Sequence, residues 1–192
     1  GIQWREIPVL YCANNFNGPC VGELVEAELG HIGIPVINVT NACAGGQTSF
    51  TMAHQAVATG AYDIALALGV EQMLRGPIQG LPPTPETLTG GDSMVCKYAM
   101  KMQRAIYEHR YTLDQMAIVS VKNHKNGCYN PRSQYKLALT VEDVHNARMV
   151  ADPLTLYHCC PTGDGAAAAV LCSEKMAKRY TSPPFVKVAG CA

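Results

Sequence analysis

A single cysteine, Cys43, lies in the stretch INVTNACAGGQ (37–47), between an apolar run and a helical pattern. Where a strand ends and a helix begins, backbone N–H groups lack helical acceptors and the helix dipole adds partial positive charge. Both effects favour the thiolate, the form in which cysteine is a nucleophile. Cys43 is therefore a candidate nucleophile whose own N–H group could help to form an oxyanion hole. A small buried cysteine in a tight turn is the alternative.

Two pairs of residues could shape the surroundings of this cysteine. Gly45 and Gly46 follow it and carry no side chain, so a substrate could approach the backbone closely there. Asp164 and Gly165 are typical of a turn that leads into a strand. A part in shaping the floor of an active site is the second interpretation of this pair.

Basic side chains gather in one later segment, at Lys122, His124, Lys125 and Arg132. Such a group can contact phosphate, although a plain solvated face is the alternative. His124 is in phase with the apolar positions of its helical pattern, so a packed histidine is favoured over a catalytic one.

The composition excludes several classes of protein. Of the 192 residues, 48% are hydrophobic and 16% charged, which is enough to build a core and argues against disorder. Fifteen basic and fifteen acidic residues cancel, which gives a nucleic-acid partner no electrostatic support. Nine cysteines without a CxxC pair favour reduced intracellular thiols over disulfides or a metal site. No apolar run is long enough to span a bilayer.

The elements around Cys43 alternate between strand and helix. Strands are expected at 8–12, 35–39 and 63–69, and helices at 21–32 and 46–59, with Gly33 and Gly60 as helix ends. Short connections between such elements imply an α/β fold with a parallel sheet covered on both faces.

The remainder of the chain has a different character. Residues 74–91 form a Gly/Pro-rich loop, and 92–149 are mostly helical. Thr112 with Gln115, and Thr140 with Asp143, have the spacing of capping boxes. The small-residue strand 165–172 resumes the core and is expected to pack tightly.

Four segments carry a resemblance to a known family. INVTNACAGG, ALALGVEQM, KNHKNGCYNPRSQ (122–134) and LYHCCPTGDGAAAAVLCSE (156–174) resemble the thiolase superfamily, and the last two resemble sterol-carrier-protein-type thiolases. The resemblance covers nearly all of the chain. It implies the N-terminal half of a duplicated βαβαβαββ architecture with a mostly helical inserted loop domain.

The resemblance also implies domain borders. Residues 1–73 would be the N-terminal thiolase core without its first strand and helix, and 74–160 the inserted loop domain. Residues 161–180 would return to the core. Residues 181–192 would be a linker and the truncated start of the second half.

The activity implied is an acyltransferase that cleaves or forms 3-ketoacyl-CoA through an acyl group on Cys43. Coenzyme A would be a co-substrate, with no permanently bound cofactor and no metal, and the inserted domain would contribute to its binding. The activating histidine, a second cysteine and an asparagine would lie in the second half, so the 192 residues alone are expected to be inactive. A homodimer or tetramer, a possible accessory acyl-CoA-binding subunit and a cytoplasmic location are implied. Peroxisomes or mitochondria are the alternative location.

Two other functions stay open on the residues alone. One is a different condensing enzyme of this fold, similar to hydroxymethylglutaryl-CoA synthase, because such enzymes carry a sequence like NACAGG. The other is a non-catalytic subunit that binds lipid or a partner protein.

Overall fold

A computed structural model describes residues 1–73, 85, 89, 93–180 and 184–191. The chain forms two compact units, one of residues 1–74 with 163–192 and one of residues 75–162. The predicted insertion, 74–160, overlaps the second unit. Most of the predicted loop 74–91 lies outside the described residues.

The first unit is built on a four-stranded sheet in the order β2-β1-β3-β6. Its strands are β1 (Leu10–Ala13), β2 (Val36–Val39), β3 (Ile64–Glu71) and β6 (Gly165–Cys172). The first three are parallel, as predicted. The fourth, β6, runs antiparallel to β3, with Gly165 opposite Glu71 and Cys172 opposite Ile64.

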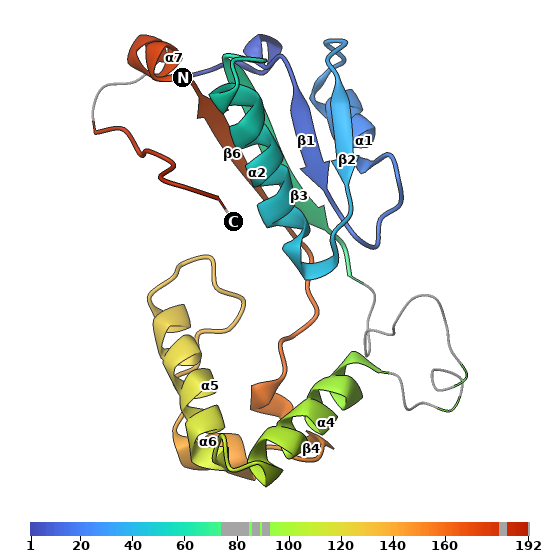
Figure 1. Ribbon diagram of the computed structural model, residues 1–192, viewed down its shortest axis with the longest axis vertical. Helices are drawn as coiled ribbons and strands as arrows, with labels where there is room; N and C mark the ends of the chain where they lie inside the picture. The colour runs from blue at the N-terminus through green and yellow to red at the C-terminus, as the bar shows by residue number, and fades with distance from the viewer. Residues whose placement is uncertain (74–84, 86–88, 90–92, 181–183, 192) are drawn as a thin grey trace. The chain divides into compact units, whose positions relative to one another are not determined.

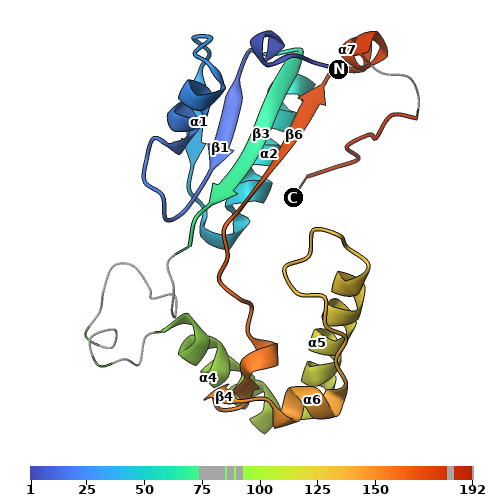
Figure 2. The same cartoon turned by 180° about the vertical axis from the view of Figure 1, so that it is seen from behind.

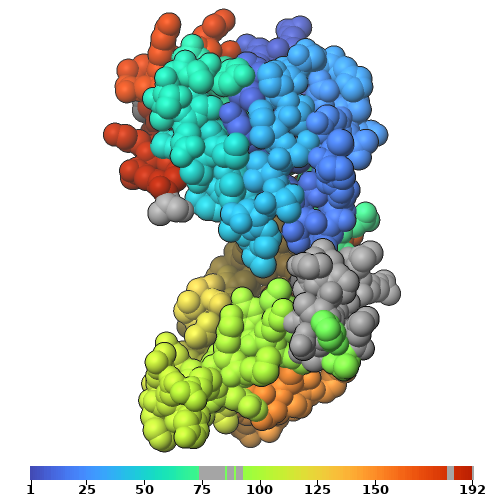
Figure 3. Space-filling model, turned by 45° about the vertical axis from the view of Figure 1, so that its right-hand side comes forward, coloured from blue at the N-terminus to red at the C-terminus, as the bar shows by residue number. Residues whose placement is uncertain are grey.

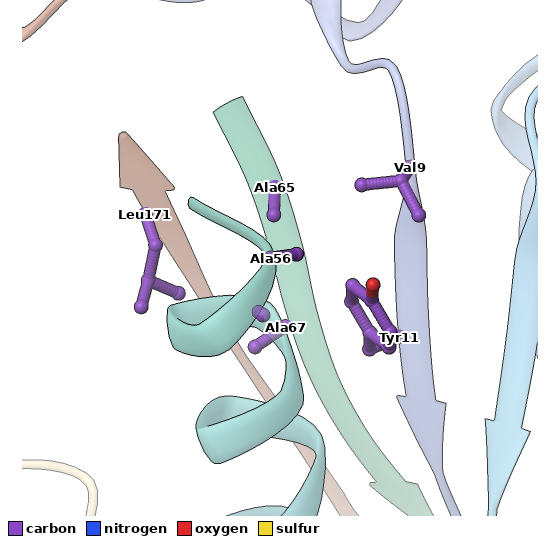
Figure 4. Packing of buried hydrophobic residues seen from close by; sticks show 7 residues of the cluster. Val9, Tyr11, Ala56, Ala65, Ala67 and Leu171 are labelled. Atoms are coloured by element: carbon purple, nitrogen blue, oxygen red, sulfur yellow. The ribbon is translucent and has the colours of Figure 1, made fainter. Parts of the chain in front are cut away.

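The two long helices of this unit cover opposite faces of the sheet, as expected for this fold class (Figures 1 and 2). Helix α2 (Gly45–Ala58) packs over Val9, Tyr11 and Leu171 (Figure 4), whereas α1 (Val21–Leu29) packs over Leu10 and Cys12. Successive side chains of a strand point to opposite faces, so β1 supplies both cores. The site-bearing end of α2 is therefore held on a sheet that is buried on both sides.

The predicted end of the first helix is wrong by one turn. The helix stops at Leu29, and Gly30, at φ +97°, takes the cap position expected for Gly33. The buried Glu26 carboxylate accepts hydrogen bonds from the N–H groups of Ile32 and Gly33, at 3.0 Å each, and so holds these residues in the turn. A hydrogen bond from His31, with these backbone bonds, lowers the pKa of Glu26.

Tight packing of the small-residue strand is also not found. Residues 165–168 of β6 are exposed, and Leu171 is the buried residue of this strand. Strand β6 lies at the edge of the sheet. Among the described residues, it pairs with β3 on one side and with no strand on the other.

The second unit is mostly helical, as predicted. Its elements are α4 (Met94–Tyr107), α5 (Leu113–Cys128), α6 (Val141–Asn146), β4 (Met149–Ala151), β5 (Leu154–Thr155) and the 3₁₀ turn η3 (Leu156–His158). Both predicted capping boxes are present, at the starts of α5 and α6. The first unit also contains the 3₁₀ turns η1 (Trp4–Glu6) and η2 (Ala42–Ala44) and the helix α7 (Glu174–Tyr180). No helix among the described residues has the length and apolar character needed to cross a membrane.

Candidate functional site

Cys43 is the middle residue of the 3₁₀ turn η2, which joins strand β2 to helix α2. Its side chain is exposed, so the alternative of a buried thiol is wrong. The segment from residue 40 to residue 58 is in view on the surface of the first unit in Figure 3, in light blue to blue-green. As the second residue of the turn, Cys43 has an N–H group without an acceptor in its own turn. The strand–turn–helix context predicted for this cysteine is confirmed.

The backbone before Cys43 adopts an unusual conformation. Ala42 has φ +44°, in the left-handed region that residues with a side chain rarely enter. Such a conformation costs about 1–2 kcal/mol and persists when the surrounding structure holds it. Sequence periodicity gives no sign of this conformation, because alanine is neutral in turn patterns.

The two glycines after Cys43 have different surroundings. Gly45 is buried, and a Cβ built on it would lie 3.5 Å from Ala13 Cβ. Gly46 is exposed, and a Cβ built there would meet nothing within 4 Å. Its other side rests on β3, since a Cβ on Gly69 would lie 3.7 Å from Gly46 Cα. Gly45 therefore seats α2 on the sheet, and Gly46 leaves open space beside Cys43.

Loops at the carboxyl ends of the parallel strands are cross-linked by acidic side chains. The Glu71 carboxylate accepts hydrogen bonds from the N–H groups of Asn15 and Phe16, at 2.9 and 3.0 Å. The predicted turn residue Asp164 accepts one from the Met73 N–H group at 3.0 Å. These carboxylates join the chain after β1, after β3 and before β6. Their hydrogen bonds hold the loops at this end of the sheet together. These bonds are to backbone N–H groups of Asn15, Phe16 and Met73, and none is to Cys43.

One buried polar residue in these loops was not singled out by the sequence. Asn14 follows β1 and is 6% exposed, and its Oδ1 accepts a hydrogen bond from the Asn17 N–H group at 3.3 Å. Its Nδ2 donor is buried and has no partner. Its backbone N–H donates to Val39 O, and its carbonyl accepts from Thr40 Oγ1. Asn14 thus anchors the end of the strand that leads to Cys43.

Six of the other eight thiols fall into two groups, and Cys96 and Cys191 are half-buried. Burial raises the pKa of Cys12 to about 11, and burial also raises the pKa of Cys159 and of Cys172. These three thiols are held in the protonated form, which is a weak nucleophile. Cys20, Cys128 and Cys160 are exposed, as Cys43 is. Cys20 is the N-cap of α1, whereas Cys128 and Cys160 do not lie at the start of a helix.

The basic segment lies in the second unit and is divided by the fold. His124 Nδ1–H donates to Leu137 O at 3.1 Å. The rings of His124 and Tyr157 are in edge-to-face contact, with 5.7 Å between their centroids. These contacts agree with the packed histidine favoured by the sequence. Lys122, Lys125 and Arg132 are exposed instead, at the end of α5 and in the turn after it. Among the described residues, no group of three or more His, Cys, Asp or Glu side chains could hold a metal ion.

The first unit is an α/β domain that presents an exposed cysteine in the turn before a helix. Residues 9–175 match the family Thiolase, N-terminal domain, and the chain belongs to this family.

Relatives of known name agree with the family. The chain is 37% identical to an acetyl-CoA acetyltransferase of Methanothermobacter thermautotrophicus, over 100% of this chain and 53% of that protein. It is 37% identical to the benzoylsuccinyl-CoA thiolase subunit BbsB of Thauera aromatica, over 94% of this chain and 48% of that protein. Sterol carrier protein 2 of Bos taurus is 38% identical over 82% of this chain and 32% of its own length. The chain thus spans about half the length, or less, of these curated relatives.

Solved structures share the fold. The Ltp2-ChsH2(DUF35) aldolase matches with a TM-score of 0.72 at 23% identity, over 90% of this chain and 46% of that one. The dimeric peroxisomal thiolase of Saccharomyces cerevisiae matches with a TM-score of 0.65 at 16% identity, over 91% and 54%. The predicted thiolase-like α/β fold is confirmed.

Proposed function

We propose that the complete protein is a thiolase that transfers acyl groups between 3-ketoacyl-CoA and coenzyme A, with Cys43 as the nucleophile. The observation that carries this proposal is the exposed Cys43 thiol in the turn that opens α2. Membership of the thiolase family supports it, as do relatives named acetyl-CoA acetyltransferase and benzoylsuccinyl-CoA thiolase subunit.

In the direction of cleavage, the Cys43 thiolate attacks the 3-keto carbon of the substrate. The bond between C2 and C3 then breaks, the acyl group stays on Sγ as a thioester, and the acetyl-CoA carbanion takes a proton. Coenzyme A thiolate next attacks the thioester, which releases the shortened acyl-CoA and restores the Cys43 thiolate. In the direction of synthesis, the same carbanion condenses with the acyl group on Cys43.

The turn that carries Cys43 suits this chemistry. The tetrahedral intermediates carry negative charge on oxygen, which backbone N–H groups at a helix start can stabilise. The Cys43 N–H group is proposed as one such donor. Space beside Gly46 lets the thioester approach the backbone.

Coenzyme A is proposed as co-substrate, with its phosphates near the second unit. Lys122, Lys125 and Arg132 are exposed there and could pair with phosphate oxygens. His124 is proposed to support this segment through its contacts with Leu137 and Tyr157.

A homodimer and an accessory subunit are proposed as partners of the complete protein. One relative is named a subunit, and one solved neighbour is named for a complex with a DUF35 protein.

The test is an acyl adduct on residue 43. The complete protein, incubated with a 3-ketoacyl-CoA and quenched, should carry the acyl group on the Cys43 peptide in mass spectra. Cys43→Ala should abolish CoA-dependent cleavage, whereas Cys128→Ala, which removes another exposed thiol, should leave it within about twofold. Turnover without an adduct on residue 43 would refute the nucleophile.

A second candidate function follows from the relatives named sterol carrier protein 2. In this case the protein binds lipid or a partner and transfers no acyl group. The same experiment separates the two functions, because binding of an acyl-CoA without an adduct or cleavage would favour the second.

A further inference from the structure

Two side chains are hydrogen-bonded to each other across the turn that carries Cys43. Asn41, just before the turn, donates from Nδ2 to Thr48 Oγ1 at 2.8 Å. Thr48, in the first turns of α2, donates from Oγ1 to Ala44 O at 2.9 Å. The two bonds run from one end of the turn to the other, and we call this pair the Asn41–Thr48 clasp. Residues 42–44 lie inside it.

The clasp differs from ordinary helix capping. Asparagine before a helical turn normally accepts a hydrogen bond from an N–H group of that turn through its Oδ1. Asn41 occupies this position and makes no such bond. Its amide donates to Thr48 instead, so the side chain does not compete for the N–H group of Cys43.

The rest of the turn is held from below. Gly45 packs on Ala13, and Ser49 Oγ donates to Gly46 O at 2.9 Å and lies 3.3 Å from Leu68 O. These contacts fix the start of α2 to the sheet. They do not restrain the exposed side of the turn. The left-handed Ala42 lies on that side, between Asn41 and Cys43. The hydrogen bonds of the Asn41–Thr48 clasp span this exposed side of the turn.

We propose that Asn41 and Thr48 are positioning residues for Cys43, and that their hydrogen bonds hold the thiol and its N–H group in the geometry used for acyl transfer. The proposal rests on the proposed function of Cys43 as the nucleophile. A displacement of about 1 Å in a reacting group can cost about 100-fold in rate, so the loss of a restraint beside a nucleophile is measurable.

The test uses variants of the clasp in the complete protein: Asn41→Ala removes the bond between Asn41 and Thr48, and Thr48→Val removes this bond and the bond to Ala44 O. Thr48→Val removes the hydroxyl at nearly constant volume, Thr48→Ser keeps it, and Asn41→Ala removes the amide. Thr51→Val is the matched control: Thr51 lies on the same helix, and its Oγ1 accepts a hydrogen bond from Gln47 Nε2 at 3.3 Å. The thermal-unfolding midpoint of each variant verifies that it is folded.

Two readouts are measured for each variant. The first is kcat and KM for cleavage of a 3-ketoacyl-CoA. The second is the rate at which iodoacetamide alkylates Cys43, divided by its rate at the exposed Cys20 of the same molecule.

Thr48→Val and Asn41→Ala should each lower kcat by about tenfold with KM nearly unchanged, and should lower the alkylation ratio by about threefold. Thr48→Ser should restore both readouts, and Thr51→Val should stay within about twofold of the wild type. The double variant of Asn41 and Thr48 should be no worse than the worse single one, because both share one hydrogen bond.

Unchanged kcat and an alkylation ratio that stays the same or rises in folded Thr48→Val and Asn41→Ala would overturn the proposal. Failure of the proposed function looks different. The wild type would then form no acyl adduct on Cys43, while the alkylation ratio would still decide whether the clasp positions the thiol.

Discussion

At residue 46, stability and activity should change in opposite directions. Gly46→Ala adds a methyl group in open space within a helix, so we expect the free energy of unfolding to rise by up to about 1 kcal/mol. The same methyl group narrows the approach to Cys43, and KM for the acyl-CoA should rise by about threefold or more. Thermal unfolding and steady-state kinetics measure the two effects. An unchanged KM would mean that the substrate does not pass Gly46.

Gly22 is a glycine for the opposite reason. A Cβ built on it would lie 2.5 Å from Val36 Cγ1 and 2.9 Å from Cys12 Cβ, so α1 sits directly on the sheet. Gly22→Ala should lower the free energy of unfolding by about 1–3 kcal/mol, because such a methyl group forces α1 away. Chemical denaturation measures this loss, and Gly46→Ala is its matched control. Equal stability of the two variants would contradict the contact.

At the scale of elements, η3 should make the second unit sensitive to acid. The Thr155 N–H group donates to His158 Nδ1 at 3.1 Å, so Nδ1 carries no proton and the imidazole is neutral with its proton on Nε2. That Nε2 is buried without a partner. Protonation of His158 would break the bond from Thr155 and place a charge in the interior.

Burial, and then the nearby His145, lower the pKa of His158 below its usual value of 6.5. The unfolded chain therefore binds the proton more tightly. The stabilisation by neutral His158 is complete above the unfolded pKa and is lost as the pH falls below about 6.5 toward the folded pKa. His145 itself is paired with Asp114 at 2.8 Å, on the neighbouring helix.

His158→Asn keeps an acceptor for the Thr155 N–H group and does not titrate. We expect the fall in thermal-unfolding midpoint between about pH 7.5 and about pH 5 to be smaller in this variant than in the wild type. His54→Asn, in the first unit, is the control. Equal pH dependence in wild type and His158→Asn would show that His158 is not the sensor.

The elements that the sequence predicted well are those with local signals. The apolar run before Cys43 and the helical pattern after it placed the turn correctly, and Thr112 and Thr140 begin helices as their capping boxes indicate. The end of α1 was missed because Glu26 binds N–H groups six and seven residues further on, which no periodicity records. The Asn41–Thr48 hydrogen bond and the left-handed Ala42 depend likewise on how the turn folds back on α2.

At the scale of the whole molecule, we expect iodoacetamide to alkylate Cys43 in the 192 residues alone. We do not expect these residues to cleave a 3-ketoacyl-CoA. The expectation follows from the resemblance to thiolases, which implies an activating histidine and a second cysteine in a second half; this chain spans 53% and 48% of two relatives. A comparison of thiolysis by the 192-residue chain and by the complete protein measures this. Steady turnover by the shorter chain would contradict it.

The antiparallel pairing of β3 with β6 brings the two ends of the second unit's chain segment together. Glu71 lies opposite Gly165, and Asp164 accepts a hydrogen bond from Met73 just beyond this pair. Because the ends of the segment are fixed next to each other by the first unit, the free energy of closing the loop changes only slowly with its length. This is the point at which evolution can lengthen, shorten or exchange a whole segment while the sheet and the turn that carries Cys43 stay the same.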